Sequence, residues 1–112
     1  MSNKELEKEL KKQMANIKKN KDGFTLVHYS IEALEKLEDI DMARAFVEAA
    51  EKTIGQEDQP HPCDIGKQIY EVFKDSKRAK RAYESALKAS GWDASSIKST
   101  EKDWAKISKS FS

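Results

Sequence analysis

Apolar residues recur every three or four positions along most of the chain, which is the spacing of one face of an α-helix. The first stripe, within residues 3–20, consists of Leu6, Leu10, Met14 and Ile17. Ser2 and Glu5 stand ahead of it as a capping-box pair, in which each side chain binds the backbone N–H of the other residue. Asp22 and Gly23 form a turn signal that ends this helix. Because the stripe is narrow, we expect the helix to pack at an edge or against a partner.

Residues 24–54 contain neither glycine nor proline and carry two further helical stripes. These stripes are Phe24, Val27, Ile31 and Leu34, followed by Ala43, Phe46, Val47, Ala50 and Ile54. Between them lie Asp39 and Asp41, either of which could cap a new helix, and Gly55 provides a stop. The pattern leaves open whether this segment is one long helix or two.

Residues 55–63 form the one convincing loop, which contains two prolines and a glycine. Asp64 is expected to cap the helix that follows. Apolar or small residues then recur until Gly91, at Ile65, Ile69, Val72, Ser76, Ala79, Tyr83 and Ala86. A single helix here would have about 26 residues, well above the usual mean of about 11–12. Asp75 and Ser76 are competent caps for a second helix, so both alternatives stay open.

A last helix is predicted over residues 95–111, with Ile97, Trp104, Ile107 and Phe111 on one face. No segment alternates as a strand does, and alanine, leucine, glutamate and lysine, which favour helix, dominate the sequence. We therefore predict one all-α domain over residues 1–112, a small bundle of four to six helices with antiparallel helical hairpins. We expect residues 24–54 to pair with residues 64–90 as a central hairpin, which the two end helices cover.

A faint internal repeat has an offset of 36 residues. The paired positions are Ala43 and Ala79, Val47 and Tyr83, Glu48 and Glu84, Ala50 and Ala86, Lys52 and Lys88, and Gly55 and Gly91. This spacing of small and larger residues resembles the second helix of a tetratricopeptide-type (TPR) repeat. The resemblance covers residues 27–91 and departs from the family pattern at Cys63, where an aromatic is usual, and at Lys67, where glycine is usual. It implies a TPR-like fold that binds a peptide or a partner protein.

The net charge of +1 conceals three blocks of alternating sign. Residues 1–21 hold seven lysines and three glutamates, residues 22–76 hold five basic and thirteen acidic residues, and residues 77–112 hold nine basic and four acidic residues. Opposite blocks could face each other within the fold or simply solvate its surface. They could also form two separate recognition surfaces of opposite sign, and the sequence leaves both readings open.

The densest basic cluster is Lys77, Arg78, Lys80 and Arg81. If a helix begins at Ser76, these cations occupy its first turns, where the helix dipole disfavours positive charge. A local rule broken without an evident gain suggests a function. If the helix instead runs through from Asp64, the four residues form a patch in its middle. With the lysine face of the last helix, the candidate partner-binding residues are Lys77, Arg78, Lys80, Arg81, Lys98 and Lys102, and a merely solvated patch is the alternative.

Reactive side chains come together only near Cys63, where His61 could act as a base for a thiol at a helix N-terminus. No orienting group or oxyanion site accompanies them, and the adjacent Asp64 opposes thiolate formation. Zinc binding would require a coincidence of the fold with His28, and the acidic residues 32–41 lack the Glu-x-x-His motif of di-metal bundles. Phosphate-loop and hydrolase motifs are also absent. We predict no catalytic residue, no metal ligand and no cofactor.

These observations favour a non-enzymatic protein–protein interaction module, such as an adaptor, an inhibitor or a regulatory subunit. The alternatives are a nucleic-acid-binding accessory protein that uses the basic helix patch, although a pI near 7.8 is low for one, and a cysteine-dependent redox or transfer enzyme at Cys63. The lysine-rich beginning, the lack of a long apolar run and the single cysteine predict a cytoplasmic protein that does not bind membranes. The narrow first stripe leaves room for a homodimer.

Overall fold

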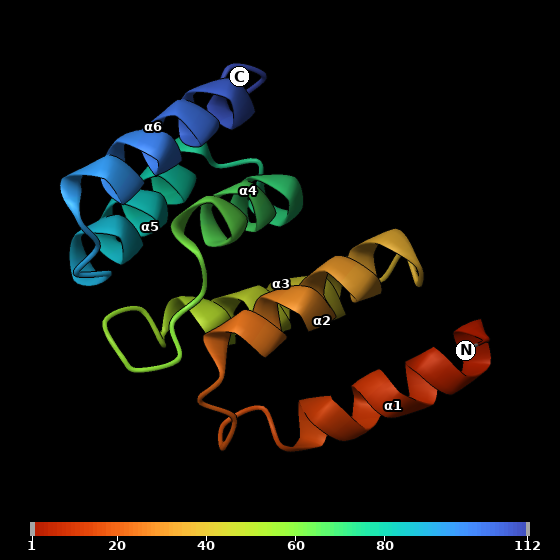
Figure 1. The fold of residues 1–112 in the computed structure, drawn as a ribbon. Coiled ribbons are helices and arrows are strands. Elements are labelled where there is room, and N and C mark those ends of the chain that lie inside the picture. Colours follow the sequence, from red (N-terminus) through yellow and green to blue (C-terminus); the bar gives the residue numbers. More distant parts are fainter. Residues whose placement is uncertain (1, 112) are drawn as a thin grey trace.

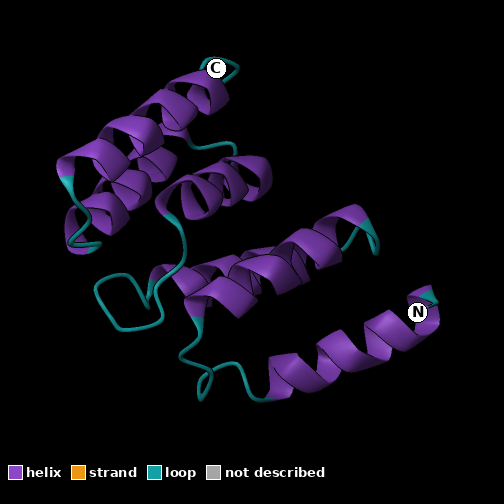
Figure 2. Cartoon of the chain, viewed as in Figure 1, coloured by secondary structure: helices purple, strands orange, loops and turns teal. Residues whose placement is uncertain are grey.

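The computed structural model describes residues 2–111, which form six α-helices and no strand (Figures 1 and 2). The helices are α1 (Asn3–Ala15), α2 (Gly23–Glu35), α3 (Ile40–Glu51), α4 (Pro62–Phe73), α5 (Ser76–Ala89) and α6 (Ala94–Ser108). The prediction of a small all-α bundle is confirmed. The first and last helices are shorter than expected, because α1 ends at Ala15 and α6 at Ser108.

Each of the two long central segments is broken into two helices, so the single-helix alternatives are wrong. The first break places Glu38 in the left-handed region at φ 52°, and the second places Lys74 there at φ 53°. An aspartate follows each of them, and the carboxylates of Asp39 and Asp75 each accept a 3.0 Å hydrogen bond from the backbone N–H three residues on. The left-handed residue ends one helix and the aspartate caps the next.

The stacking of the segments also differs from the expectation of one central hairpin. Helices α2 and α3 form one antiparallel hairpin, α4 and α5 form a second, and α4 packs against both helices of the first. Helix α1 lies along the first hairpin at one end of the molecule, and α6 covers α4 and α5 at the other (Figure 1). The break at each aspartate causes this difference, because a segment that folds back on itself pairs within itself.

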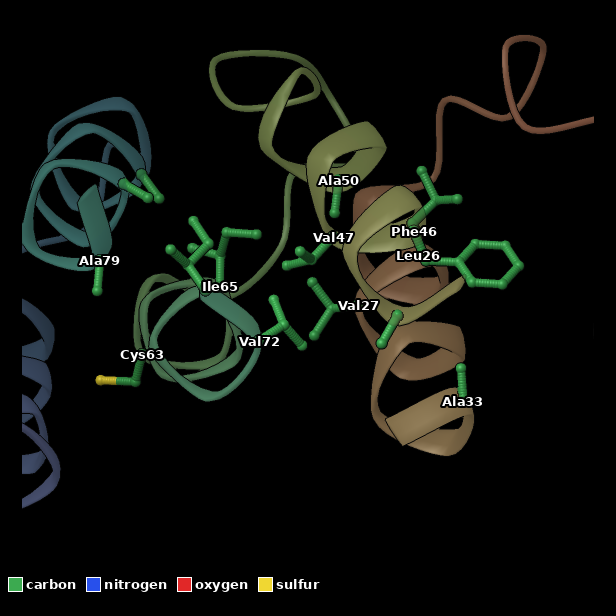
Figure 3. Packing of buried hydrophobic residues seen from close by; sticks show 14 of the residues in the cluster. Leu26, Val27, Ala33, Phe46, Val47, Ala50, Cys63, Ile65, Val72 and Ala79 are labelled. Carbon is green, nitrogen blue, oxygen red and sulfur yellow. The ribbon is translucent and has the colours of Figure 1, made fainter. Parts of the chain in front are cut away.

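The core lies between the two hairpins. Figure 3 shows Val27 and Val47 of the first hairpin facing Ile65 and Val72 of α4, and all four are at most 3% exposed. Small residues let the helices approach closely, since Ala43, Ala50, Ala79 and Ala86 are fully buried. One apolar cluster includes residues from Leu6 of α1 to Trp104 of α6.

One buried polar chain crosses the same core. The Ser30 hydroxyl donates to the backbone carbonyl of Ala43 at 2.7 Å, and the Gln68 amide donates to the Ser30 oxygen at 2.9 Å. These bonds join α2, α3 and α4. Within residues 2–111, every buried side-chain nitrogen or oxygen has a hydrogen-bond partner. These hydrogen bonds therefore fix the register of the two hairpins and leave none of these buried polar groups without a partner.

The start of α4 corrects the expected cap. The helix begins at Pro62, and its N-cap is His61, whose Nδ1 accepts a 3.1 Å hydrogen bond from the backbone N–H of Cys63. Asp64, which we expected to be the cap, lies inside the first turn. A proline is favoured at the first helical position because its fixed φ is already helical and it has no N–H to satisfy. The N-cap therefore lies three residues earlier than predicted.

Candidate partner-binding surfaces

The outward sides of α5 and α6 carry eight cations, which we call the basic face. On α5 these are Lys77, Lys80, Arg81 and Lys88; on α6 they are Lys98, Lys102 and Lys106, with Lys109 at its C-cap. All eight are exposed. On α5 they lie opposite the buried Ala79, Ala82, Tyr83 and Ala86, because a step of 100° per residue separates the two sets. The same geometry places the lysines of α6 opposite Trp104.

No cation of the basic face has a carboxylate within ion-pair distance in the described part of the chain. Glu84 is the one carboxylate on α5. Lys77 also lies in the first turn of α5, where the helix dipole disfavours a positive charge. Clustered like charges repel one another, and an anionic partner would relieve that repulsion.

Arg78 does not belong to the basic face, although the sequence placed it with its neighbours. Its guanidinium pairs with Glu51 of α3, with Nη2 2.8 Å and Nε 3.4 Å from the two carboxylate oxygens. It also stacks over the ring of Phe73 at 4.1 Å and is one quarter exposed. The hydrogen bond that Arg78 donates to Glu51 raises the pKa of Arg78 further above its usual value. Arg78 therefore holds the second hairpin to the first, and the structure does not present it to a partner.

A groove of about 330 Å³ lies beside the basic face, between α5 and α6. Its lining consists of Ser76, Lys77, Lys80, Trp104, Ser108 and Phe111. The floor is aromatic, because Trp104 stacks on Tyr83 at 4.3 Å and meets the edge of Phe111 at 5.5 Å. Gly66 of α4 makes room for this stack, since a Cβ there would lie 2.5 Å from Trp104 Cζ3. The groove thus offers an apolar floor and a cationic rim.

Cys63 lacks the environment that a nucleophilic cysteine needs. Its side chain points away from the first hairpin (Figure 3), is 4% exposed and has Sγ 3.6 Å from the carbonyl oxygen of Thr100. Burial and the charges of Asp103 and Asp64 raise the thiol pKa to about 11. The thiol pKa is therefore shifted in the direction opposite to the lowered pKa that the cysteine-enzyme hypothesis requires. The imidazole of His61 is engaged with the backbone of Cys63 rather than with the thiol.

The other residues considered as metal ligands do not come together in the fold. Within residues 2–111, no group of three or more His, Cys, Asp or Glu side chains is placed to hold a metal ion. The exposed His28 pairs with Glu32 of its own helix at 3.0 Å. No helix in this part of the chain is both long enough and apolar enough to cross a membrane.

The structure reveals a second surface, built from aromatic rings, that the sequence analysis missed. Phe24 was assigned to the apolar stripe of its helix, yet it is 65% exposed, and Trp92 is 37% exposed. The rings of Trp92 and His61 lie 5.4 Å apart. Phe24 and His61 line the same hollow as Trp92. Nothing in the local sequence indicates this meeting, because the three residues come from separate segments.

Comparisons of the chain with protein-family models, with curated proteins and with solved structures find no match in any of the three. The function must therefore be argued from these surfaces, and the TPR resemblance stays a prediction.

Proposed function

We propose that this chain is a non-enzymatic protein-binding module whose basic face docks an acidic segment of a partner protein. One observation carries the proposal: eight exposed cations along two adjacent helices have no carboxylate partner within residues 2–111, whereas the neighbouring Arg78 does. Two stacked helical hairpins, as the TPR resemblance would imply, are a suitable scaffold for such binding. The free, buried Cys63 is consistent with a cytoplasmic setting.

An acidic protein segment fits the site better than a nucleic acid does. The net charge is only +1, and the acidic residues of the first hairpin would repel a long polyanion. Trp104 is 9% exposed, so its ring is not free to stack on bases. A segment that combines carboxylates with apolar side chains could pair with Lys77 and Lys80 and also fill the groove between α5 and α6.

The binding free energies expected from ion pairs indicate which other contacts the partner must supply. Exposed ion pairs contribute about 0.2–1 kcal/mol each, so several pairs give only a few kcal/mol. Micromolar binding requires about 8 kcal/mol. Apolar contacts in the groove must therefore provide a large share, which favours an amphipathic acidic segment over a purely acidic one.

The test is a binding titration with a fluorescent peptide that has leucines at helical spacing and glutamates elsewhere. Changing Lys80, Arg81 and Lys102 to glutamine should weaken binding by about tenfold or more, because several ion pairs are lost together. The matched control changes Lys4, Lys8 and Lys19 of the N-terminal region to glutamine, which removes the same charge away from the site. The affinity should also fall as salt is added.

Two further probes make the test decisive. A peptide with every glutamate replaced by glutamine should bind much more weakly than the acidic peptide. Single-stranded oligothymidylate should bind more weakly as well. Tighter binding of the oligonucleotide would favour the nucleic-acid alternative, and equal losses in the two triple variants would refute a specific basic face.

A further inference from the structure

Three aromatic side chains from separate segments line one hollow where α2 and α4 begin and α5 ends. Phe24 lies in the first turn of α2, His61 caps α4, and Trp92 follows α5. All three line a hollow of about 310 Å³, whose other walls are the loop before α4 and the last turn of α5. We call this hollow the aromatic cup. Its segments lie on one side of the molecule in Figure 1.

The cup is held in shape by the loop between α3 and α4. The backbone N–H of Gly23 donates to the carbonyl of Asp58, and the Gln59 amide donates to the carbonyl of Ala86, both at 2.8 Å. Pro60 is fully buried, and a Cβ on Gly23 would collide with Thr53 and Pro60. The loop is thereby tied to α2 and to α5. A site that is already formed loses little conformational freedom on binding.

Carboxylates line the cup and a smaller hollow beside it. Glu57 lines the cup, and Asp64 lines a smaller hollow of about 90 Å³ that shares Phe24, Pro60 and His61 with it. Both carboxylates are exposed, and neither takes part in an ion pair among the described residues. No lysine or arginine lines either hollow. The cup therefore repels anions and attracts cations.

We propose that the aromatic cup binds an arginine side chain from a basic segment of a partner protein. A guanidinium is planar, stacks on aromatic faces and is only weakly hydrated, so it suits the exposed rings of Phe24 and Trp92. Its N–H groups can donate to the carboxylate of Glu57. The smaller hollow, with Val27 and Ile31 in its wall, accepts an apolar side chain next to the arginine. No cation of the basic face lines the cup, so the inference stands independently of the proposed function.

The probe is a capped glycine–leucine–arginine–glycine peptide, titrated into the full chain and followed by the two tryptophan indole N–H resonances. The Trp92 resonance should shift, whereas that of Trp104, buried between Tyr83 and Phe111, should stay in place. The matched lysine peptide should bind about threefold more weakly, because its ammonium is more strongly hydrated and does not stack as a planar group does. The glutamine peptide should cause no saturable shift.

Variants locate the site. Phe24→Ala should weaken the arginine peptide about fivefold, since a cation–π contact and apolar area are lost. Glu57→Gln should weaken it about twofold to fivefold, the range for an exposed ion pair. Glu35→Gln removes an equally exposed carboxylate at the far end of α2 and should leave the affinity unchanged.

Three results would each overturn the inference. The first is the absence of any Trp92 shift, and the second is equal affinity for the arginine and glutamine peptides. The third is a Trp92 shift that depends on protein concentration without peptide and disappears in Phe24→Ala, because a second copy of the chain would then occupy the cup. None of these results bears on the basic face, whose test uses different variants and an acidic peptide.

Discussion

The two hairpins share one frame and differ in their outer surfaces. Residues 36 positions apart adopt the same backbone, since Glu38 and Lys74 are both left-handed and Asp39 and Asp75 both cap the following helix. The loop glycines Gly55 and Gly91, which are also 36 positions apart, have positive φ as well. Within residues 2–111, only these two glycines, Glu38 and Lys74 have positive φ. The backbones of the two hairpins therefore correspond at these positions, and the internal repeat stays a prediction.

The outer charges are reversed between the equivalent helices. Helix α3 carries three carboxylates and one arginine, whereas α5 carries five cations and one carboxylate. At equivalent positions Lys77 replaces Asp41, and Arg81 replaces Ala45. Folding needs the same turn, caps and buried alanines in both hairpins, but it sets few demands on exposed positions. On the outer face of α5, binding to a partner can therefore decide which residues are present, because the fold sets few demands there.

Because the two hairpins share one backbone arrangement, equivalent core substitutions should lower the free energy of unfolding by the same amount. Ala43→Leu and Ala79→Leu should each lower the free energy of unfolding by about 1–3 kcal/mol, because both positions are fully buried between close helices. Urea denaturation followed by circular dichroism measures both. If one variant were as stable as the unmodified chain while the other lost stability, the two hairpins would not be equivalent in packing.

A titratable group distinguishes the hairpins at one buried position, where Cys63 is equivalent to Val27. The folded pKa of the thiol, about 11, lies above the ordinary value of 9.0. Folding therefore favours the neutral thiol, and its contribution is complete below pH 9 and is lost as the pH rises through about 11. The loss reaches about 3 kcal/mol once the pH exceeds the folded pKa.

Cys63→Val would make the two hairpins alike at this position and remove the thiol's contribution to the pH dependence of stability. Urea titrations near pH 8 and near pH 11 should show a smaller loss of stability in the variant than in the unmodified chain. Other groups that titrate in this range are common to both proteins and cancel in the comparison, except Tyr83, whose pKa is raised by burial and by the charge of Cys63. Identical losses would contradict the raised pKa of Cys63.

Arg78 is the charged counterpart of Met42, and Arg78→Met tests what that difference contributes to stability. The variant should lose about 1–2 kcal/mol, because the paired carboxylate of Glu51 is left without its cation while part of the contact with Phe73 is retained. Lys80→Met, on the exposed side of the same helix, is the matched control and should change stability by less than about 0.5 kcal/mol. A double-mutant cycle with Glu51→Gln isolates the pair, and a coupling near zero would count against its structural role.

Most of the fold follows from the sequence because helical periodicity and caps are local signals. The stripes of Phe46 and Ile69 identify buried faces, and Asp39 and Asp75 mark the places where new helices could begin. The choice between one helix and two was not predictable, because a left-handed residue such as Lys74 carries no signature that glycine or asparagine would give. His61 as a cap was missed because imidazole is an unusual capping group.

The candidate surfaces were predicted only in part, since periodicity reports which side of a helix is exposed and not what lies opposite. Lys77 and Lys102 are exposed as expected, but Arg78 meets Glu51 through a contact between residues 27 positions apart. The aromatic cup depends on Phe24, His61 and Trp92, which only the stacking of the hairpins brings together. Such long-range meetings depend on the tertiary arrangement of the helices.

The smallest expected change in stability tests the comparison most sharply. Lys77→Asp with Arg81→Ala gives α5 the residues that α3 carries at equivalent positions. Stability should change by no more than about 0.5 kcal/mol, and a slight gain is expected, since an aspartate in the first turn of α5 interacts favourably with the helix dipole. Binding of the acidic peptide should nevertheless fall severalfold, because two cations leave the basic face and a carboxylate enters it. Urea denaturation and the peptide titration on the same sample measure both effects. A large loss of stability would show that these cations serve the fold, and the reversal of charge between the hairpins would then need a structural explanation instead of a partner.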